Sequence, residues 1–331
     1  MSETCTCLTT LERGSSNAYN CWGAFFGAEM QQCKPIEPEP VRTGGGNRSW
    51  IQNPLTLFSR VPGPQFKGQT MVFKALTIAG SDSGGGAGIQ ADLKAFSAMG
   101  VYGASALTAV TAQNTRAVTA VHPVPDDVVV AQIEAVLSDI EIGAIKIGML
   151  GTPSLIKAVA GALQGFDGPV VLDPVMVAKS GDTLLADSAI DTLKTYLLPR
   201  ATVLTPNLPE ASKLLEGKDY PVLSQAHDLL ALGPKAVLMK GGHADGKTCT
   251  DYLCTGTGEI AQTVPRVMTQ NTHGTGCSYS SAIAACLAKG KGLEEAVCTA
   301  HNWLHSAILR SDELNVGQGH GPVHHFHGMW G

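Results

Sequence analysis

The sequence predicts an α/β fold in which a central, mostly parallel sheet is covered by helices on both faces. Short aliphatic runs recur along the chain, bounded by glycine or proline and separated by amphipathic segments of helical length. These runs are apolar throughout rather than at alternate residues, which is typical of parallel strands enclosed on both sides. Of the 331 residues, 44% are hydrophobic and 15% are charged, so the chain can bury the large core that such a fold requires.

The expected strands and helices alternate along the chain. Strands are expected at residues 75–79, 105–111, 144–148, 169–173, 201–205 and 236–240. Helices are expected at residues 88–99, 125–140, 153–163 and 186–198, with a further buried helix of small residues following residue 277. Ligands of such folds bind outside the carboxyl ends of the strands. We therefore expect the functional residues just after each strand.

The composition changes near residue 71. Residues 1–70 contain clusters of Ser, Thr, Gly and Pro without a helical or strand period, and we predict a largely disordered extension. An organellar presequence is the alternative, although such segments are usually poor in acidic residues and this one contains five glutamates. Residues 71–331 are predicted to form a single α/β domain.

Charge and cysteine content exclude several classes of protein. The net charge of -5 argues against a nucleic-acid-binding or membrane-surface protein. The nine cysteines form no CxxC pair, which favours free thiols in a reducing compartment. No apolar run reaches the roughly 18 residues of a membrane span. The sequence therefore predicts a cytoplasmic protein, or an organellar one if residues 1–70 are a presequence.

A first glycine-rich loop, residues 80–88, follows a strand and opens a helix. It partly fits the dinucleotide fingerprint, but the acidic residue expected about 20 positions later is missing, and no Gly-Lys-Ser/Thr of a P-loop follows. A tight strand-to-helix turn is the simpler interpretation. Because Asp82 lies in the loop and Asp92 one helical turn beyond Gly88, the segment could instead orient a small heterocycle.

A second glycine-rich turn, residues 271–277, precedes the small-residue helix. The amides of Gly274, Thr275, Gly276 and Cys277 would be first-turn donors without intrahelical acceptors, and with the helix dipole they could hold an anion such as a phosphoryl group. A helix start should also lower the pKa of Cys277, whose thiolate could accept a proton from a hydroxyl. The alternative is that Cys277 is a small buried apolar residue.

Three further strand ends carry polar residues. Asn207 and Glu210 are three apart at a helix start, which suits oxygen ligation of Mg²⁺ or a capping box. Lys240 precedes two glycines and could meet a phosphate, with a surface turn as the alternative. Asp173 places a carboxylate after another strand. These sites fall at one predicted edge of the sheet, which favours a common function.

Taken together, the motifs resemble the hydroxymethylpyrimidine/phosphomethylpyrimidine kinases of the ribokinase-like superfamily. The resemblance runs from about residue 74 to residue 330, and its motifs are AGSDSGGGAGIQADLK, TAVTAQNT, KIGMLG, VLDPVMVAKSG, LTPNLPEA, LMKGGH, NTHGTGC and GHGPVHHFH. It implies a ribokinase-like fold and two successive phosphoryl transfers from MgATP in thiamine biosynthesis, first to 4-amino-5-hydroxymethyl-2-methylpyrimidine and then to its monophosphate. Residues 1–70 have no counterpart in the resemblance.

The resemblance also implies roles for individual residues. The pyrimidine pocket would be lined by Gly80, Asp92, Gln113, Met149 and Val175. Magnesium and the phosphates would be organised by Asn207, Glu210 and Asp173, with Lys240 near the nucleotide. Cys277 stands where sugar kinases of the superfamily place an aspartate base.

The resemblance leaves two alternatives. A pyridoxal or pyridoxine kinase would share the fold and the reaction, but Gln113 with Met149 is better matched to a flat aminopyrimidine. A non-catalytic ligand-binding relative is disfavoured because the anion turn, Asn207, Glu210 and Lys240 are all present. The expected partners are ATP and the pyrimidine substrates in a homodimer, without nucleic acid or membrane.

Overall fold

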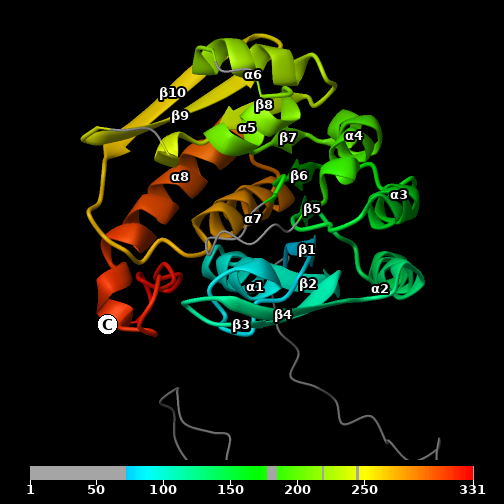
Figure 1. Cartoon of the computed structure of the whole chain (residues 1–331), viewed down its shortest axis with the longest axis horizontal. Coiled ribbons are helices and arrows are strands. Elements are labelled where there is room, and N and C mark those ends of the chain that lie inside the picture. Colours follow the sequence, from blue (N-terminus) through cyan, green and yellow to red (C-terminus); the bar gives the residue numbers. More distant parts are fainter. Residues whose placement is uncertain (1–71, 177–184, 218–219, 244–245, 331) are drawn as a thin grey trace, which may run out of the picture. The chain divides into compact units, whose positions relative to one another are not determined.

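An eight-stranded sheet forms the centre of the fold in the computed structural model, which describes residues 72–176, 185–217, 220–243 and 246–330 (Figure 1). These residues belong to one unit, Phe66–Gly331. The extension predicted over residues 1–70 lies outside the described residues. Within them, the strand order is β10-β9-β8-β7-β6-β5-β1-β2.

Six neighbouring strands of this sheet are parallel, and two antiparallel strands complete one edge. The parallel strands are β1 (Lys74–Ala79), β2 (Tyr102–Leu107), β5 (Ala144–Ile147), β6 (Val170–Leu172), β7 (Val203–Leu204) and β8 (Ala236–Met239). The antiparallel strands are β9 (Thr248–Thr255) and β10 (Gly258–Pro265). The predicted fold class, an α/β protein with a central, mostly parallel sheet, is confirmed.

Helices cover both faces of the sheet (Figure 1). One face carries α2 (Asp126–Asp139), α3 (Pro153–Ala162), α4 (Asp187–Tyr196), α5 (Leu208–Leu214) and α6 (Val222–Leu230). The other carries α1 (Gly88–Ala98), α7 (Thr275–Ala288) and α8 (Leu293–Leu309). Short 3₁₀ turns lie at Leu198–Arg200, Gly241–His243 and Ser311–Leu314.

The two apolar cores explain why the strands are apolar throughout. Adjacent residues of a strand point to opposite faces, so Leu172 packs into one core and its neighbour Val171 into the other. Helix α7 is buried from Ser278 to Ala288, because it packs between the sheet and helices α1 and α8. The expected buried helix of small residues is confirmed.

The single strand expected at residues 105–111 is wrong. Strand β2 ends at Leu107, and the chain then enters β3 (Ala109–Gln113), which pairs with β4 (Val118–Pro123) in a separate two-stranded antiparallel sheet. The intervening Thr108 donates its N–H to Ala79 O at 3.0 Å and its Oγ1–H to Met149 O at 2.9 Å. These long-range hydrogen bonds fix the chain at Thr108, between β2 and β3. No glycine or proline marks this point in the sequence.

The parallel register brings the ends of β1, β5, β6, β7 and β8 to one edge of the sheet. Ile78 pairs with Ile147, Ile147 with Leu172, Leu172 with Leu204, and Leu204 with Val237, so these strands end within about two residues of one another. The residues just after the strands, including those of the glycine-rich loop, therefore meet at this edge. Among the described residues, no helix is long and apolar enough to cross a membrane.

Candidate functional site

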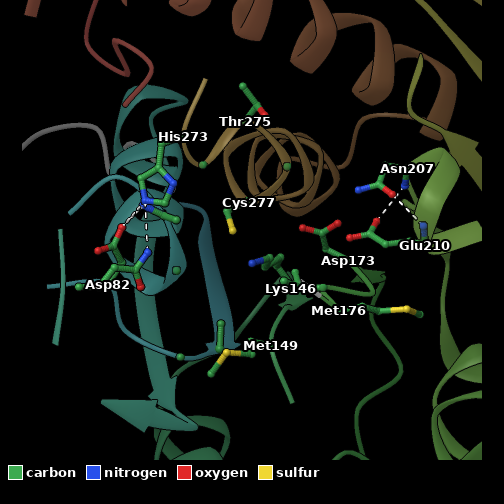
Figure 2. A pocket seen from close by; sticks show the side chains of 18 of the residues that line it. Asp82, Lys146, Met149, Asp173, Met176, Asn207, Glu210, His273, Thr275 and Cys277 are labelled. Atoms are coloured by element: carbon green, nitrogen blue, oxygen red, sulfur yellow. Dashed lines mark hydrogen bonds and ion pairs between the residues drawn. The ribbon is translucent and has the colours of Figure 1, made fainter. Parts of the chain in front are cut away.

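A cavity of about 470 Å³ opens at the carboxyl edge of the parallel strands, a size suited to a small ligand. Of the candidate residues singled out from the sequence, all but Asp92 line it: Gly80, Asp82, Gln113, Met149, Asp173, Val175, Asn207, Glu210, Lys240, Gly274, Thr275, Gly276 and Cys277. Figure 2 shows Asp82 and His273 on one side of this site and Asp173, Asn207 and Glu210 on the other, with Cys277 and Lys146 between them and Met149 below.

Asp82 ties the two glycine-rich turns together. Its carboxylate accepts hydrogen bonds from the backbone N–H groups of Gly84 at 2.8 Å, Gly86 at 3.1 Å and Ala87 at 2.8 Å. It also lies 2.7 Å from Nε2 of His273, in the second turn (Figure 2). Burial alone would raise the pKa of Asp82, but His273 and these amides outweigh it and lower that pKa.

The second turn needs glycine at its closest approach to the first. Gly274 has a φ of 76°, and a Cβ there would lie 1.8 Å from the carbonyl oxygen of Gly86. Helix α7 begins immediately afterwards at Thr275, whose N–H reaches Thr272 O at 3.4 Å. The first-turn amides of Gly276 and Cys277 therefore lack intrahelical acceptors at the wall of the cavity.

The pKa expected for Cys277 is wrong in this structure. Burial raises the pKa of its thiol to about 11; the nearby ammonium of Lys146 lowers that pKa, whereas the carboxylates of Asp92 and Asp173 raise it. The helix start was expected to favour the thiolate, but desolvation and two buried carboxylates act against it. The sequence could not reveal those carboxylates as neighbours, because they come from other elements.

On the opposite side of the cavity, Lys240 joins two carboxylates. Its Nζ lies 2.7 Å from Asp173 Oδ1 and 3.8 Å from Glu210 Oε2. Asp173 also accepts a hydrogen bond from the Thr205 hydroxyl at 3.1 Å. Burial opposes ionisation of Asp173, but Lys240 and Lys146 outweigh it and lower the pKa of Asp173.

Asn207 and Glu210 form the capping box that was one of the two interpretations of this pair. Asn207 Oδ1 accepts the Glu210 N–H, and Glu210 Oε2 accepts the Asn207 N–H, both at 2.8 Å. Burial raises the pKa of Glu210 to about 7; Lys240 lowers that pKa and Asp173 raises it. Each capping side chain has lone pairs beyond those used in the box.

The donor set at this side fits a magnesium ion held partly through water. Asp173 and Glu210 supply two buried carboxylates against the one ammonium of Lys240, so negative charge remains. Among the described residues, no group of three or more His, Cys, Asp and Glu is arranged to enclose a metal. Magnesium commonly keeps several waters and uses one or two carboxylates together with substrate phosphates.

Asp92 does not line the cavity, so its expected position is wrong. Its carboxylate is fully buried beneath the cavity and accepts hydrogen bonds from Thr77 Oγ1 at 2.6 Å, Ser281 Oγ at 2.7 Å and Lys146 Nζ at 2.9 Å. The residue that lines the cavity is its partner Lys146. A lysine within the otherwise apolar strand β5 was the available signal, because a charge enclosed on both faces requires a buried partner.

Polar and apolar groups combine on the side of the cavity nearest the first loop. Gln113 lies with its Nε2 3.4 Å from His273 Nε2, and its Oε1 accepts a 3.3 Å hydrogen bond from Thr111 Oγ1. A Cβ on Gly80 would lie 2.5 Å from Met149 Cε, so glycine leaves room for the methionine. This wall therefore offers an amide beside a flexible apolar side chain.

A second cavity of about 470 Å³ adjoins the first and was not predicted. The two share Asn207, Lys240, Thr272, Thr275 and Gly276. The remaining wall of the second cavity includes Cys249, Asp251, Val264, Pro265, Arg266, Val267, Met268, Thr269, Tyr279 and His301. Its walls come from β9, β10, α7 and α8, so no single motif marks it.

Relatives of known activity match most of the chain. The model of the phosphomethylpyrimidine kinase family matches residues 82–324. The hydroxymethylpyrimidine/phosphomethylpyrimidine kinase of Escherichia coli is 52% identical over 261 residues, covering 77% of this chain and 98% of that protein. The chloroplastic thiamine biosynthetic bifunctional enzyme TH1 of Arabidopsis thaliana is 41% identical over 292 residues, covering 86% of this chain and 56% of that protein.

Solved structures agree with these relatives. An ADP complex of Bacillus subtilis pyridoxal kinase superposes with a TM-score of 0.71 at 38% identity, covering 77% of this chain and 98% of that one. The phosphomethylpyrimidine kinase of Clostridium difficile superposes with a TM-score of 0.63 at 44% identity, covering 71% and 99%. The resemblance inferred from the motifs is confirmed, and the chain belongs to the phosphomethylpyrimidine kinase family.

Proposed function

We propose that this chain transfers the γ-phosphoryl group of ATP to the hydroxymethyl group of 4-amino-5-hydroxymethyl-2-methylpyrimidine, and then a second one to the monophosphate. The homologues confirm the predicted enzyme class and the place of the reaction in thiamine biosynthesis. The observation that supports the proposal most is the cavity itself. Its lining combines the glycine-rich turn and Cys277 with the wall of Gly80, Gln113 and Met149 and with the cluster of Lys240, Asp173 and Glu210.

The wall of the cavity that includes Gly80, Gln113 and Met149 suits the pyrimidine. The Gln113 amide can both donate to and accept from an aminopyrimidine edge, and Met149 and Val175 can pack on the ring faces. Gly80 keeps that space open at the end of β1. In this proposal Asp92 does not touch the ring and acts through Lys146.

The second cavity suits the base and ribose of ATP, because it joins the first through residues that can meet phosphates. Lys240 would pair with a phosphate, and the amides of Gly276 and Cys277 would donate to the transferring group. Asn207 and Glu210 would hold magnesium through water, with Asp173 beside them. Magnesium bound there would neutralise phosphate charge.

Cys277 would take the proton that the substrate hydroxyl loses as its oxygen bonds to phosphorus and the bond to ADP breaks. A thiol with a pKa of about 11 is mostly protonated near neutral pH, so only a small thiolate fraction could do this. Phosphoryl transfer depends mainly on positioning and charge neutralisation. We therefore expect the glycine-rich turn to contribute more than Cys277 to the acceleration of phosphoryl transfer.

Pyridoxal is the second candidate substrate, since structures of pyridoxal kinases are among the neighbours at 36–38% identity. A substrate panel decides between the two. The full chain is given ATP and magnesium with the pyrimidine, its monophosphate or pyridoxal, and ADP release is measured. We expect two ADP per pyrimidine and one per monophosphate. ADP release with pyridoxal but none with the pyrimidine would reject the proposal.

We further propose that the chain is a cytoplasmic homodimer whose residues 1–70 are a disordered extension not needed for turnover by the kinase domain, residues 71–331. The alternative, an organellar location, is supported by the chloroplastic relative. Equal turnover of the full chain and of residues 72–331 is expected. A folded but inactive shorter chain would contradict the dispensability of the extension, and sedimentation velocity tests the dimer.

A further inference from the structure

Lys146 is a fully enclosed ammonium at the floor of the cavity. It lies on the central strand β5, its side chain is 0% exposed, and its Nζ is 2.9 and 3.1 Å from the two oxygens of Asp92. A Cβ on Gly148 would lie 2.6 Å from this Nζ, so glycine at the strand end provides the space for the ammonium. A charge buried this deeply is costly unless it is paired, which the Asp92 contact accomplishes.

The pair is also connected to the helix that carries Cys277. Asp92 Oδ1 accepts a 2.7 Å hydrogen bond from Ser281, which lies four residues after Cys277 and so on the same face of α7. Figure 2 shows the Cys277 thiol and the Lys146 ammonium directed into the same part of the cavity. Asp92 therefore joins α1, β5 and α7 directly below the reaction centre proposed above.

We infer that Lys146 is a positioning residue for phosphoryl transfer: Asp92 holds its ammonium below Cys277, where a fixed positive charge stabilises the negative charge that forms on the sulfur. This inference rests on the proposed role of Cys277. Neither Lys146 nor Asp92 needs to touch the substrate in this arrangement. The positive charge would already be in place before the proton leaves the hydroxyl, at no cost of reorganisation.

Four charged groups act on the Cys277 thiol from the surrounding elements. Lys146 from β5 lowers the pKa of Cys277, whereas Asp92 from α1 and Asp173 after β6 raise it. Lys240 after β8 balances Asp173 at 2.7 Å. Burial would lower the pKa of Lys146, but Asp92 outweighs it and keeps that pKa raised, so the ammonium stays charged.

Two substitutions in the same network should act differently on Cys277. Lys146→Met removes the positive charge and should slow alkylation of Cys277 by iodoacetamide about tenfold or more at a given pH, which is one unit of thiol pKa. Ser281→Ala removes a hydrogen bond to Asp92 but no charge, so its alkylation rate should stay close to that of the wild type. The alkylated Cys277 peptide is quantified by mass spectrometry from pH 6 to 10 on the full chain, with exposed Cys298 as the internal reference.

A merely structural role would slow alkylation in both variants alike. Equal slowing in Lys146→Met and Ser281→Ala, or no slowing in Lys146→Met, would overturn the inference. If a single variant does not fold, Asp92→Asn/Lys146→Met removes both charges together; it should alkylate more slowly than the wild type, and equal or faster alkylation would overturn the inference.

Alkylation requires no substrate, so the result stands apart from the kinase assay. If the pyrimidine is not phosphorylated and only Lys146→Met slows alkylation, the proposed function fails while the electrostatic link holds. If the pyrimidine is phosphorylated and both variants slow alkylation equally, the link fails alone. When both hold, kcat in Lys146→Met should fall more than KM rises, since the charge acts mainly as the transition state forms.

Discussion

Two aspartate–lysine ion pairs lie at the same edge of the sheet and differ in how completely the protein shields them from solvent. Asp92 and Lys146 meet at 2.9 Å with both side chains 0% exposed, whereas Asp173 and Lys240 meet at 2.7 Å with side chains 1% and 13% exposed. The distances are similar. What differs is the surroundings. Thr77 and Ser281 complete the first pair from inside the protein, and Lys146 reaches the floor of the first cavity without being exposed. Lys240 is partly exposed and borders both cavities.

This difference shows that residue type does not decide whether a buried ion pair binds ligands. A pair whose hydrogen-bonding capacity is used within the fold holds elements together and sets a local field. A pair whose lysine is partly exposed at a cavity keeps hydrogen-bonding capacity for a charged ligand. The three predictions below test this distinction, from the largest expected effect to the smallest.

The fully buried pair, Asp92 and Lys146, should contribute most to stability. Asp92→Ala leaves Lys146 buried without its counter-charge, so we expect the free energy of unfolding to fall by about 3–5 kcal/mol. Urea unfolding followed by circular dichroism measures it. Asp191→Ala is the matched control, because it breaks the exposed contact with Lys194 at 3.8 Å and should change little. Equal losses of unfolding free energy in the two variants would show that the Asp92–Lys146 pair is not shielded from water in solution.

The partly exposed pair, Asp173 and Lys240, should matter most for turnover. Lys240→Met should lower kcat by roughly 10²–10³ because it removes a charged donor from the transferring phosphate. Its loss of unfolding free energy should be smaller than that of Asp92→Ala, since Asp173 keeps the Thr205 hydroxyl and the nearby positive charge of Lys146. Lys235→Met, at an exposed position, serves as the control and should retain full turnover. If Lys240→Met keeps its kcat, the cluster does not bind phosphate.

A third carboxylate, Asp82, should make a pH-dependent contribution to stability without a lysine ion pair. Asp82 is held by His273 and three amides; burial opposes ionisation, but His273 and the amides of Ala87 and Gly84 outweigh it and lower the pKa of Asp82 in the folded protein. Its stabilisation is therefore complete above about pH 4, the unfolded value, and is lost as the pH falls through the lower folded value. At pH 7, Asp82→Asn should lower the free energy of unfolding by roughly 1.5–3 kcal/mol.

Urea unfolding at pH 7, 5 and 3 checks this dependence. The difference between wild type and Asp82→Asn should stay constant from pH 7 to 5 and shrink at pH 3. A difference that is the same at all three pH values would mean that the charge of Asp82 contributes nothing.

The sequence by itself determined the α/β class, the family and most of the site. Buried parallel strands demand continuous apolar runs, and their ends must meet at one edge, so residues such as Lys240 and Glu210 could be assigned to a common site. The Asn207 capping box could be read as well, because its two partners are only three residues apart. Interactions within one helical turn follow from local spacing.

The tertiary structure alone decided which charges face one another. Asp92 lies 54 residues from Lys146, and Asp82 lies 191 residues from His273, so no local pattern connects either pair. The same holds for the break at Thr108 and for the pKa of Cys277, which depends on carboxylates from α1 and β6. Desolvation and Coulomb interactions act through space, and only the packed chain defines those distances.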